Sequence, residues 1–211
     1  RAIDEANPKY FIAENVSGLK SVQDGRWLKL QMDTFNNIGS HGYSIASKIV
    51  NARDFGVPQR RKRVFIIGVR KDLDKQPVFP KKQKRLIVKD VYDRNYPIED
   101  EAKKLSPCYI PRLKLLKQGE QPQGSYFSLK RNHMLRPSYT ITASYGAGAC
   151  VMHPFEDRHM SIAELKDICS FPQDYKLLGS YRDKCERLGR SVPPNMMKNI
   201  VLTLKKEVFN E

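Results

Sequence analysis

The segment from Val64 to Val69 constrains the fold of this chain more than any other feature. It reads Val-Phe-Ile-Ile-Gly-Val, so an extended strand here is apolar on both faces. The runs Tyr10 to Ala13 and Tyr43 to Val50 predict two further strands. Between them, apolar residues recur at helical spacing from Trp27 to Ile38. Strand, helix, strand and strand in this order predict an α/β layer around a largely buried sheet.

The composition and the apolar pattern of the sequence change near Asp72. Residues 72–157 hold most of the prolines and only short apolar runs, which predicts a separate lobe with little regular structure. Farther on, Ser161 and Glu164 form a capping box, and a second helix is predicted from Tyr181 to Leu188. A last helix is predicted to start at Pro194, with one apolar side that contains Met197, Ile200, Val201, Leu204 and Val208.

Positive charge dominates the composition and is concentrated in one stretch. The chain has 38 Lys and Arg against 23 Asp and Glu, a formal net charge of +15. Thirteen of the basic residues lie between Arg53 and Lys89, against three Asp. Such an excess favours a polyanionic partner, above all nucleic acid. Solubility alone is the competing explanation.

The four cysteines, Cys108, Cys150, Cys169 and Cys185, are widely spaced and form no C-x-x-C pair. We interpret them as reduced thiols of an intracellular protein, with neither a disulfide framework nor a zinc site. No apolar run is long enough to predict a transmembrane helix. The chain begins at Arg1 with no leader of the secretory type, so we expect no secretion and a gene product that starts upstream.

Four blocks of residues are weak signals singly and gain meaning from their order. Two lie in the first third of the chain and two near its end: Glu14-Asn15-Val16 within Pro8 to Gly18, Gln59 to Arg63 within Asn51 to Gly68, Phe171 to Tyr175, and Leu188 to Pro194. In this order they resemble the cytosine-C5 DNA methyltransferase family. The resemblance covers roughly residues 1–70 and 155–205, and it touches the middle lobe only at Arg136 to Ile141.

The resemblance implies the C-terminal part of a Rossmann-like, α/β, S-adenosylmethionine-dependent methyltransferase sheet, together with a small irregular target-recognition lobe. Residues 1–78 would be the second half of the catalytic domain and 79–157 the recognition lobe. Residues 158–211 would be a hinge helix and a C-terminal helix that returns to the catalytic domain. The implied reaction moves a methyl group from S-adenosylmethionine to C5 of a cytosine flipped out of duplex DNA. We expect a cytoplasmic enzyme of a bacterial restriction-modification system that acts on nucleoid DNA, with no membrane and no metal.

The chemistry of this family assigns roles to the first two blocks. In the family a cysteine thiolate adds to C6 of cytosine, and charge accumulates on N3 and O2 of the ring. By similarity, Glu14 is expected to be the acid at N3 and the amino group, and Arg63 the guanidinium at O2. Arg61 is expected to hold the loop and the phosphates. Asn15 and Gln59 are expected to be supporting hydrogen-bonding partners.

Contacts to DNA are expected from the basic block and the middle lobe. Arg60, Arg61 and Lys62 would bind the backbone, and Thr140 would lie against it beside the flipped nucleotide. A β-branched residue in a short strand is the alternative interpretation of Thr140. A cluster of aromatic and basic side chains is expected to enter a groove: Tyr126, Phe127, Lys130, Arg131, Asn132 and His133.

The last block implies a contact to the cofactor. Arg190, Ser191 and Val192 match the family block that touches S-adenosylmethionine, except that the family has Asn where this chain has Arg190. A long cation can still pair with the carboxylate of the cofactor.

Two blocks of the family do not occur in the 211 residues. They are the Gly-rich F-x-G-x-G turn for the methionine part of the cofactor and the P-C-Q nucleophile block. Cys108 follows a proline but lies after Arg63, in the wrong order, so we interpret it as a structural or incidental thiol. We expect the nucleophile and most of the cofactor pocket to come from a missing N-terminal half, in cis or as a separate chain. This chain alone would then be inactive, and the apolar face of its last helix would be exposed.

Two other interpretations stay open. The chain would fit a non-catalytic DNA-recognition subunit of a split methyltransferase, which supplies target recognition to a partner. It would also fit a fragment of an RNA cytosine-C5 methyltransferase.

Overall fold

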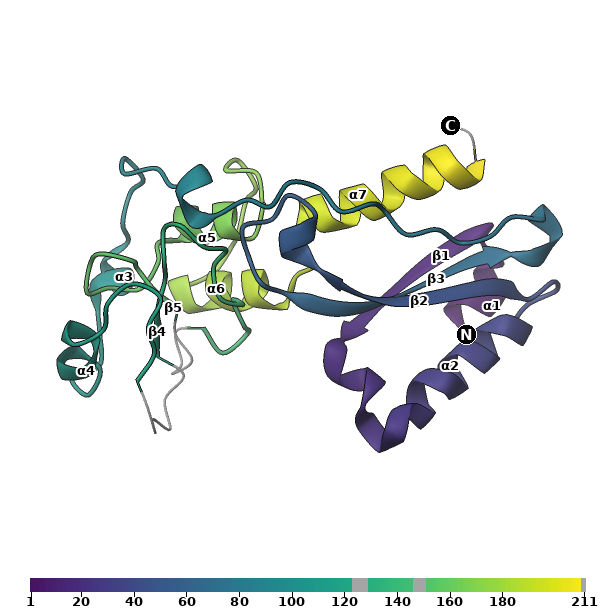
Figure 1. Ribbon diagram of the computed structural model, residues 1–211, viewed down its shortest axis with the longest axis horizontal. Coiled ribbons are helices and arrows are strands. Elements are labelled where there is room, and N and C mark those ends of the chain that lie inside the picture. Colours follow the sequence, from purple (N-terminus) through teal and green to yellow (C-terminus); the bar gives the residue numbers. More distant parts are fainter. Residues whose placement is uncertain (123–128, 146–150, 210–211) are drawn as a thin grey trace. The chain divides into compact units, whose positions relative to one another are not determined.

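The computed structural model describes residues 1–122, 129–145 and 151–209, and its elements are labelled in Figure 1. The chain forms two compact units. The sheet unit contains Arg1–Asn51, Lys62–Lys82 and Lys198–Glu211, and the loop unit contains Ala52–Arg61 and Gln83–Met197. The chain therefore passes between the units more than once. The division at residues 78 and 157 stays a prediction.

A three-stranded sheet forms the centre of the sheet unit. Its strands are β1 (Tyr10–Val16), β2 (Tyr43–Asn51) and β3 (Lys62–Arg70), in the order β1-β3-β2. Both outer strands run antiparallel to β3. Residues 64–69 of β3 are all buried, which confirms the prediction of a strand that is apolar on both faces.

One face of this sheet is covered by α2 (Arg26–Asn37), which two turns of 3-10 helix, Ser17–Lys20 and Val22–Gly25, connect to β1. The short helix α1 (Ala2–Ala6) precedes β1. The buried core on this face consists of Phe11, Leu28, Tyr43, Val64 and Ile66.

Gly68 leaves room for the aromatic ring of Phe11 in that core. It lies directly opposite Phe11 in the β1–β3 pairing, and a Cβ on Gly68 would come within 2.2 Å of the Phe11 ring. The ring lies over the glycine instead and also contacts Tyr43 edge-on, with ring centroids 5.1 Å apart. The glycine inside this strand is therefore a packing requirement.

The opposite face of the sheet is covered by α7 (Pro194–Leu204) and the π-helical segment Lys205–Phe209 that follows it (Figure 1). Because side chains alternate along a strand, Tyr10 and Phe65 project from this face. The ring of Phe209 lies 5.1 Å from that of Tyr10. Ile200, Leu204 and Val208 are buried. The prediction that the apolar side of the last helix is exposed was therefore wrong.

The loop unit has short elements joined by long irregular segments, as the sequence predicted. Its elements are α3 (Asp100–Lys103), α4 (Ile110–Lys114), β4 (Lys130–Arg131), β5 (Val151–Met152), α5 (Ile162–Ile168) and α6 (Tyr181–Arg190). The predicted capping box of Ser161 and Glu164 is present at α5. An equivalent box of Ser180 and Asp183, which was not predicted, begins α6. Residues 146–150, and with them Cys150, lie outside the described residues.

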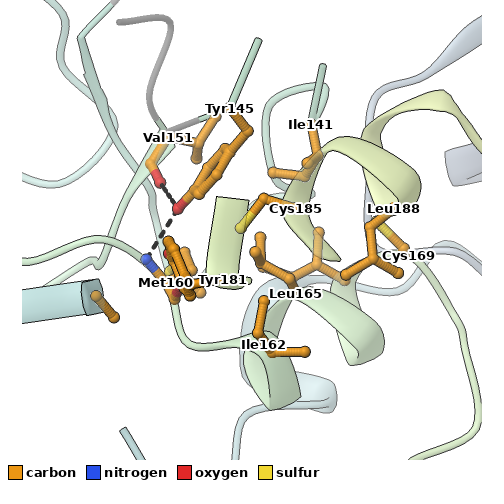
Figure 2. Close-up of a cluster of buried hydrophobic side chains, with 12 residues drawn as sticks. Ile141, Tyr145, Val151, Met160, Ile162, Leu165, Cys169, Tyr181, Cys185 and Leu188 are labelled. Carbon is orange, nitrogen blue, oxygen red and sulfur yellow. Dashed lines mark hydrogen bonds between the residues drawn. The ribbon is translucent and has the colours of Figure 1, made fainter. Parts of the chain in front are cut away.

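Two tyrosines organise the core of the loop unit, which Figure 2 shows. The Tyr145 hydroxyl donates to the Val151 carbonyl and accepts from the Met160 amide, both at 2.8 Å. The Tyr181 hydroxyl donates to the Met160 carbonyl at 2.6 Å. Around them pack apolar side chains from α5, α6 and the preceding loop, including Ile141, Leu165, Ile168, Cys185 and Leu188.

A buried network of charged groups adjoins β5. Arg158 donates to both oxygens of Glu164, at 2.8 and 2.9 Å, and also pairs with Glu156. The His153 ring is fully buried, and its Nδ1 accepts from the Glu156 amide at 2.9 Å. Its Nε2 lies 3.1 Å from the Tyr92 hydroxyl. With Nδ1 as an acceptor, the ring is assigned as the neutral tautomer with its proton on Nε2.

This network predicts loss of stability in mild acid. Burial, followed by the charge of Arg158, lowers the pKa of His153 from its ordinary 6.5 to about 4. Between these values the unfolded chain takes up a proton that the folded chain excludes, so stability is full above pH 6.5 and declines as the pH falls toward 4. The loss is at most about 3 kcal/mol for this group.

Urea unfolding at a series of pH values measures this effect. His153→Gln should flatten the dependence of the free energy of unfolding on pH between 6.5 and 4, and the exposed control His41→Gln should not. Part of the slope should remain in the first variant because burial also lowers the pKa of His159. An unchanged slope in His153→Gln would contradict this interpretation.

Candidate functional site

Glu14 and Arg63 meet on neighbouring strands of the sheet unit. The Arg63 Nε lies 2.8 Å from Glu14 Oε1. In the β1–β3 pairing, Glu14 is opposite Phe65 and Val16 is opposite Arg63, so both charged side chains project from the same face. The sequence predicted that β1 ends at Ala13. It continues to Val16 because pairing with β3 extends that far. Glu14 therefore lies within a strand that fixes its direction.

The pair is partly sheltered and still accessible. The side chains of Glu14 and Arg63 are 25% and 16% exposed. The Arg63 Nη1 also donates to the Lys62 carbonyl at 2.8 Å, which orients the guanidinium. An acid and a guanidinium held side by side can address two adjacent polar atoms of one planar ring at once.

Asn15 has a local role. Its side chain is on the face opposite Glu14, and Oδ1 accepts from the Val16 amide at 2.8 Å. This contact stabilises the end of β1, as expected of a supporting residue, although its partner is an adjacent residue.

Gln59 is fully buried in the loop unit and joins three segments. Its Nε2 contacts Cys169 Sγ at 3.2 Å and the Ile168 carbonyl at 3.4 Å, and its Oε1 accepts from the Ile141 amide at 3.3 Å. Burial, the largest cause, raises the pKa of Cys169 to about 11, so this thiol stays neutral at neutral pH.

Arg61 is the most deeply buried cation of the basic block, Gln59 to Arg63. Its Nη1 donates to the Ile141 carbonyl and its Nη2 to the Gly189 carbonyl, both at 2.8 Å. Only 2% of the residue is exposed. Arg61 thus holds the loop, but its guanidinium faces the interior, so the predicted phosphate contact is not compatible with this arrangement.

Arg60 and Thr140 lie together in the loop unit. The Thr140 hydroxyl donates to the Arg60 carbonyl, and the Arg60 amide donates to the Ser138 carbonyl at 2.9 Å. Thr140 lies in a loop and not in a strand. Two segments that are 80 residues apart are thereby joined at the position where the resemblance placed a backbone contact.

The basic stretch is largely accessible. Lys62, the first residue of β3, is exposed. Four further cations are exposed along one extended segment, Lys81, Lys82, Lys84 and Arg85, of which Arg85 pairs with Asp54 at 2.7 Å.

Of the aromatic and basic cluster expected to enter a groove, Tyr126 and Phe127 lie outside the described residues. Arg131 and Asn132 are buried, so their predicted exposure was wrong. Arg131 points inward from β4, where it donates to the Leu113 carbonyl at 2.9 Å and pairs with Asp157. Lys130, the adjacent residue of the strand, is partly exposed.

The candidate cofactor residues lie at the end of α6. Arg190 is exposed and pairs with Glu186, one turn earlier, at 2.6 Å. The Ser191 hydroxyl donates to the Leu188 carbonyl at 2.8 Å, and Val192 is partly buried.

Asn195 is a positioning residue that sequence reasoning missed. Its Nδ2 donates to the Gly56 carbonyl at 3.0 Å, and its amide donates to the Ser170 hydroxyl at 3.2 Å. It therefore ties the start of α7 to the loop that precedes the basic block. Its place directly after Pro193-Pro194 was the available signal.

The described residues form neither a metal-binding cluster nor a membrane-spanning helix. No group of three or more His, Cys, Asp or Glu side chains there is arranged to hold a metal ion. None of the described helices combines the length and the apolar character that crossing a membrane requires.

Comparisons with known proteins agree on one family. The family model for C-5 cytosine-specific DNA methylase matches residues 1–206. Among curated proteins, the type II methyltransferase M.BbvI of Brevibacillus brevis is 28% identical over 98% of this chain and 60% of its own length. M.NgoPII of Neisseria gonorrhoeae is 27% identical over 98% of this chain and 67% of its own length. The chain thus spans about 60% of the length of the first of these relatives.

Solved structures share the fold at low identity. A prophage-encoded protein of E. coli, described as a DNA modification methyltransferase, has a TM-score of 0.77 at 20% identity. The match covers all of this chain and 72% of that protein's chain. The methyltransferase EhMeth of Entamoeba histolytica has a TM-score of 0.63 at 17% identity, over 97% of this chain and 64% of its own.

Arg61→Ala should destabilise the protein by roughly 2–4 kcal/mol, because two buried carbonyls lose their donors. Lys62→Ala is the matched control, since the adjacent side chain is exposed and its loss should change stability by less than about 0.5 kcal/mol. Urea denaturation of both variants measures the difference. Equal stabilities would mean that Arg61 does not hold the loop.

Proposed function

This chain belongs to the C-5 cytosine-specific DNA methylase family and has a methyltransferase fold, and on that premise we propose that it is part of a DNA (cytosine-5-)-methyltransferase. The expected family and fold class are confirmed. The proposed reaction transfers a methyl group from S-adenosylmethionine to C5 of a cytosine in duplex DNA. The names of the type II relatives support a bacterial modification system as its setting.

The contact between Glu14 and Arg63 carries this proposal. Cytosine C5 is a poor nucleophile until a thiolate adds to C6, and that addition places negative charge on N3 and O2. Glu14 would donate a proton to N3 and accept from the amino group, while Arg63 would stabilise O2. N3 and O2 are both bonded to C2 of the base and lie on the same edge of it, and the two side chains are adjacent on the sheet. Both groups thus bind the charge that develops during reaction more strongly than the starting ring.

The DNA contacts belong to the same proposal. A cytosine inside a duplex is not accessible to an acid and a guanidinium on a sheet, so the base must leave the stack. Thr140 and the Arg60 carbonyl it bonds would lie beside the backbone of the flipped nucleotide. Arg60 and Lys62 would contact phosphates, and residues 79–157 would read the target sequence.

S-adenosylmethionine would supply the electrophilic methyl group. The residues at the end of α6 fit one edge of this cofactor: Arg190 is an exposed cation, and its partner Glu186 is a surface carboxylate that the cofactor carboxylate could replace. Ser191 and Val192 would line the same edge. The rest of the pocket requires the Gly-rich turn that the 211 residues do not contain.

The nucleophile is proposed to lie on another segment, in cis or on a separate chain. Cys169 and Cys185 are buried, and Cys108 is exposed with Sγ 3.1 Å from the Ser106 hydroxyl. None of these three occurs in a P-C-Q block before Glu14.

Glu14→Gln and Arg63→Ala should each lower the rate of methyl transfer by about 10²–10⁴ in the intact or reconstituted enzyme, because each removes a group that acts on the transition state. Affinity for duplex DNA should change far less. Glu5→Gln is the matched control, since it removes the carboxylate of another ion pair in the sheet unit, that with Arg1 at 2.9 Å. Single-turnover rates and DNA titrations on the same samples separate the two effects. A wild-type rate in either site variant would refute its catalytic role.

The 211-residue chain by itself should neither methylate cytosine-containing DNA nor form a covalent adduct with a 5-fluorocytosine duplex. A polypeptide that carries the Gly-rich turn and the P-C-Q block should restore both. Methyl incorporation and a mass shift of the protein are the readouts. Turnover by the chain alone would contradict the assignment. Loss of that turnover in Cys108→Ser would then show that Cys108 is the nucleophile, although it lies after Arg63 in the sequence.

A further inference from the structure

The ring of Tyr139, in the loop unit, has two cations near it. The Arg60 guanidinium carbon lies 5.3 Å from the ring centroid and the Lys130 Nζ lies 5.2 Å from it. Among the described residues, neither cation forms an ion pair with a carboxylate. The Arg60 Nε donates to the Pro137 carbonyl at 3.3 Å. Two positive charges are therefore held near one ring without an anionic partner in the described chain.

Hydrogen bonds on every side hold this arrangement in place. The Tyr139 hydroxyl donates to the Gly119 carbonyl at 2.7 Å, and the ring packs against the core of the loop unit. The backbone on either side of Tyr139 is bonded to residues 58–60, through the Ser138 amide to the Pro58 carbonyl at 2.7 Å and through the Thr140 hydroxyl to the Arg60 carbonyl. Ring and guanidinium thus belong to one rigid piece.

Lys130 is fixed by its neighbour. On β4, the buried Arg131 bonds to Leu113 and Asp157, so Lys130 projects to the other side of the strand. Arg136 adds a third charge. Its Nη1 lies 3.6 Å from the position that a Cβ on Gly119 would occupy, and the Gly119 carbonyl accepts from the Tyr139 hydroxyl. The surface around the ring is therefore strongly positive.

The chemistry of this surface suits a phosphate. The negative face of a ring attracts each cation, but the cations repel each other, so an anion between or beside them is the missing favourable partner. An arginine fork can bind two phosphate oxygens, and a lysine adds a point charge. Surface lysines without partners are common, but here a bonded ring fixes where both cations lie.

We propose that Arg60, Lys130 and Tyr139 form a phosphate clamp that binds the backbone of duplex DNA next to Thr140. The clamp rests on the proposed function in one respect, namely that the phosphates it binds are those of duplex DNA. Arg60 and Lys130 contact the phosphates. Tyr139 is a positioning residue that sets where the two cations lie.

The test is a titration of a labelled DNA duplex with the 211-residue chain at several salt concentrations. Lys130→Ala should reduce the slope of log K against log salt by about 0.9, the loss of one phosphate contact. Lys176→Ala, an exposed lysine elsewhere in the loop unit, is the matched control and should leave the slope unchanged. Tyr139→Phe keeps the ring and should also keep the slope.

Tyr139→Leu tests the ring as a platform. It should weaken binding, and adding Lys130→Ala to it should cost less affinity than Lys130→Ala costs alone, because the two residues act together. Circular dichroism and the thermal midpoint check that this variant is folded. Lys130→Ala should leave the fold intact, because its side chain is partly exposed and donates no hydrogen bond to another of the described residues.

The outcomes separate the clamp from the proposed function. Salt-dependent binding by the wild type with an unchanged slope in Lys130→Ala would overturn the clamp and leave the function standing. No binding of duplex DNA by the wild-type chain would overturn the clamp, whereas the proposed function is decided separately by the methyl-transfer rates of the Glu14 and Arg63 variants. Binding of duplex RNA but not duplex DNA through these residues would overturn the clamp as a DNA contact.

Discussion

The hydrogen-bond register between β1 and β3 is the constraint on which the candidate site depends. It places Glu14 two residues from the partner of Arg63, so that both side chains project from one face and meet at 2.8 Å. A slip of one residue would turn one of the two charges to the opposite face. The register is fixed by the buried residues 64–69 and by the single position, Gly68, that accommodates the Phe11 ring. The packing of an apolar strand thereby determines the geometry of a polar site.

The loop unit reaches comparable order by different means. It has little regular structure, so buried polar side chains take over the role that strand ladders have in the sheet. Gln59 and Arg61 bind backbone atoms of Ile141, Ile168 and Gly189, which are far from them in sequence. Each bond satisfies a backbone group that would otherwise be buried without a partner. Alternate residues of the basic block thus differ in role. Gln59 and Arg61 are buried and bind backbone atoms of the interior, and Arg60 and Lys62 are accessible to a ligand.

The sequence predicted those features whose cause is local. The apolar run of β3, the spacing of α2, the capping box of α5 and the start of α7 at Pro194 need only neighbouring residues, and they are found. The roles of Glu14 and Arg63 came from resemblance, and the structure brings the two residues together without testing their chemistry. The errors concerned distant partners. Nothing near Arg61 or Arg131 in the sequence shows that carbonyls 18 to 128 residues away will bind them inside the protein. The last helix was expected to be exposed because the resemblance assigned its packing partner to the missing N-terminal half, but Ile200 and Leu204 are buried.

The central claim is that Glu14 and Arg63 act as one unit on the cytosine ring. A double-mutant cycle on the single-turnover rate of methyl transfer tests it most directly, with Glu14→Gln, Arg63→Ala and the two combined in the enzyme that also carries the nucleophile block. If the pair acts as a unit, the double variant should be little slower than the slower single variant, because either change already breaks the arrangement. If the two losses instead multiply, the residues act independently, and the contact between them in this structure does not explain the chemistry.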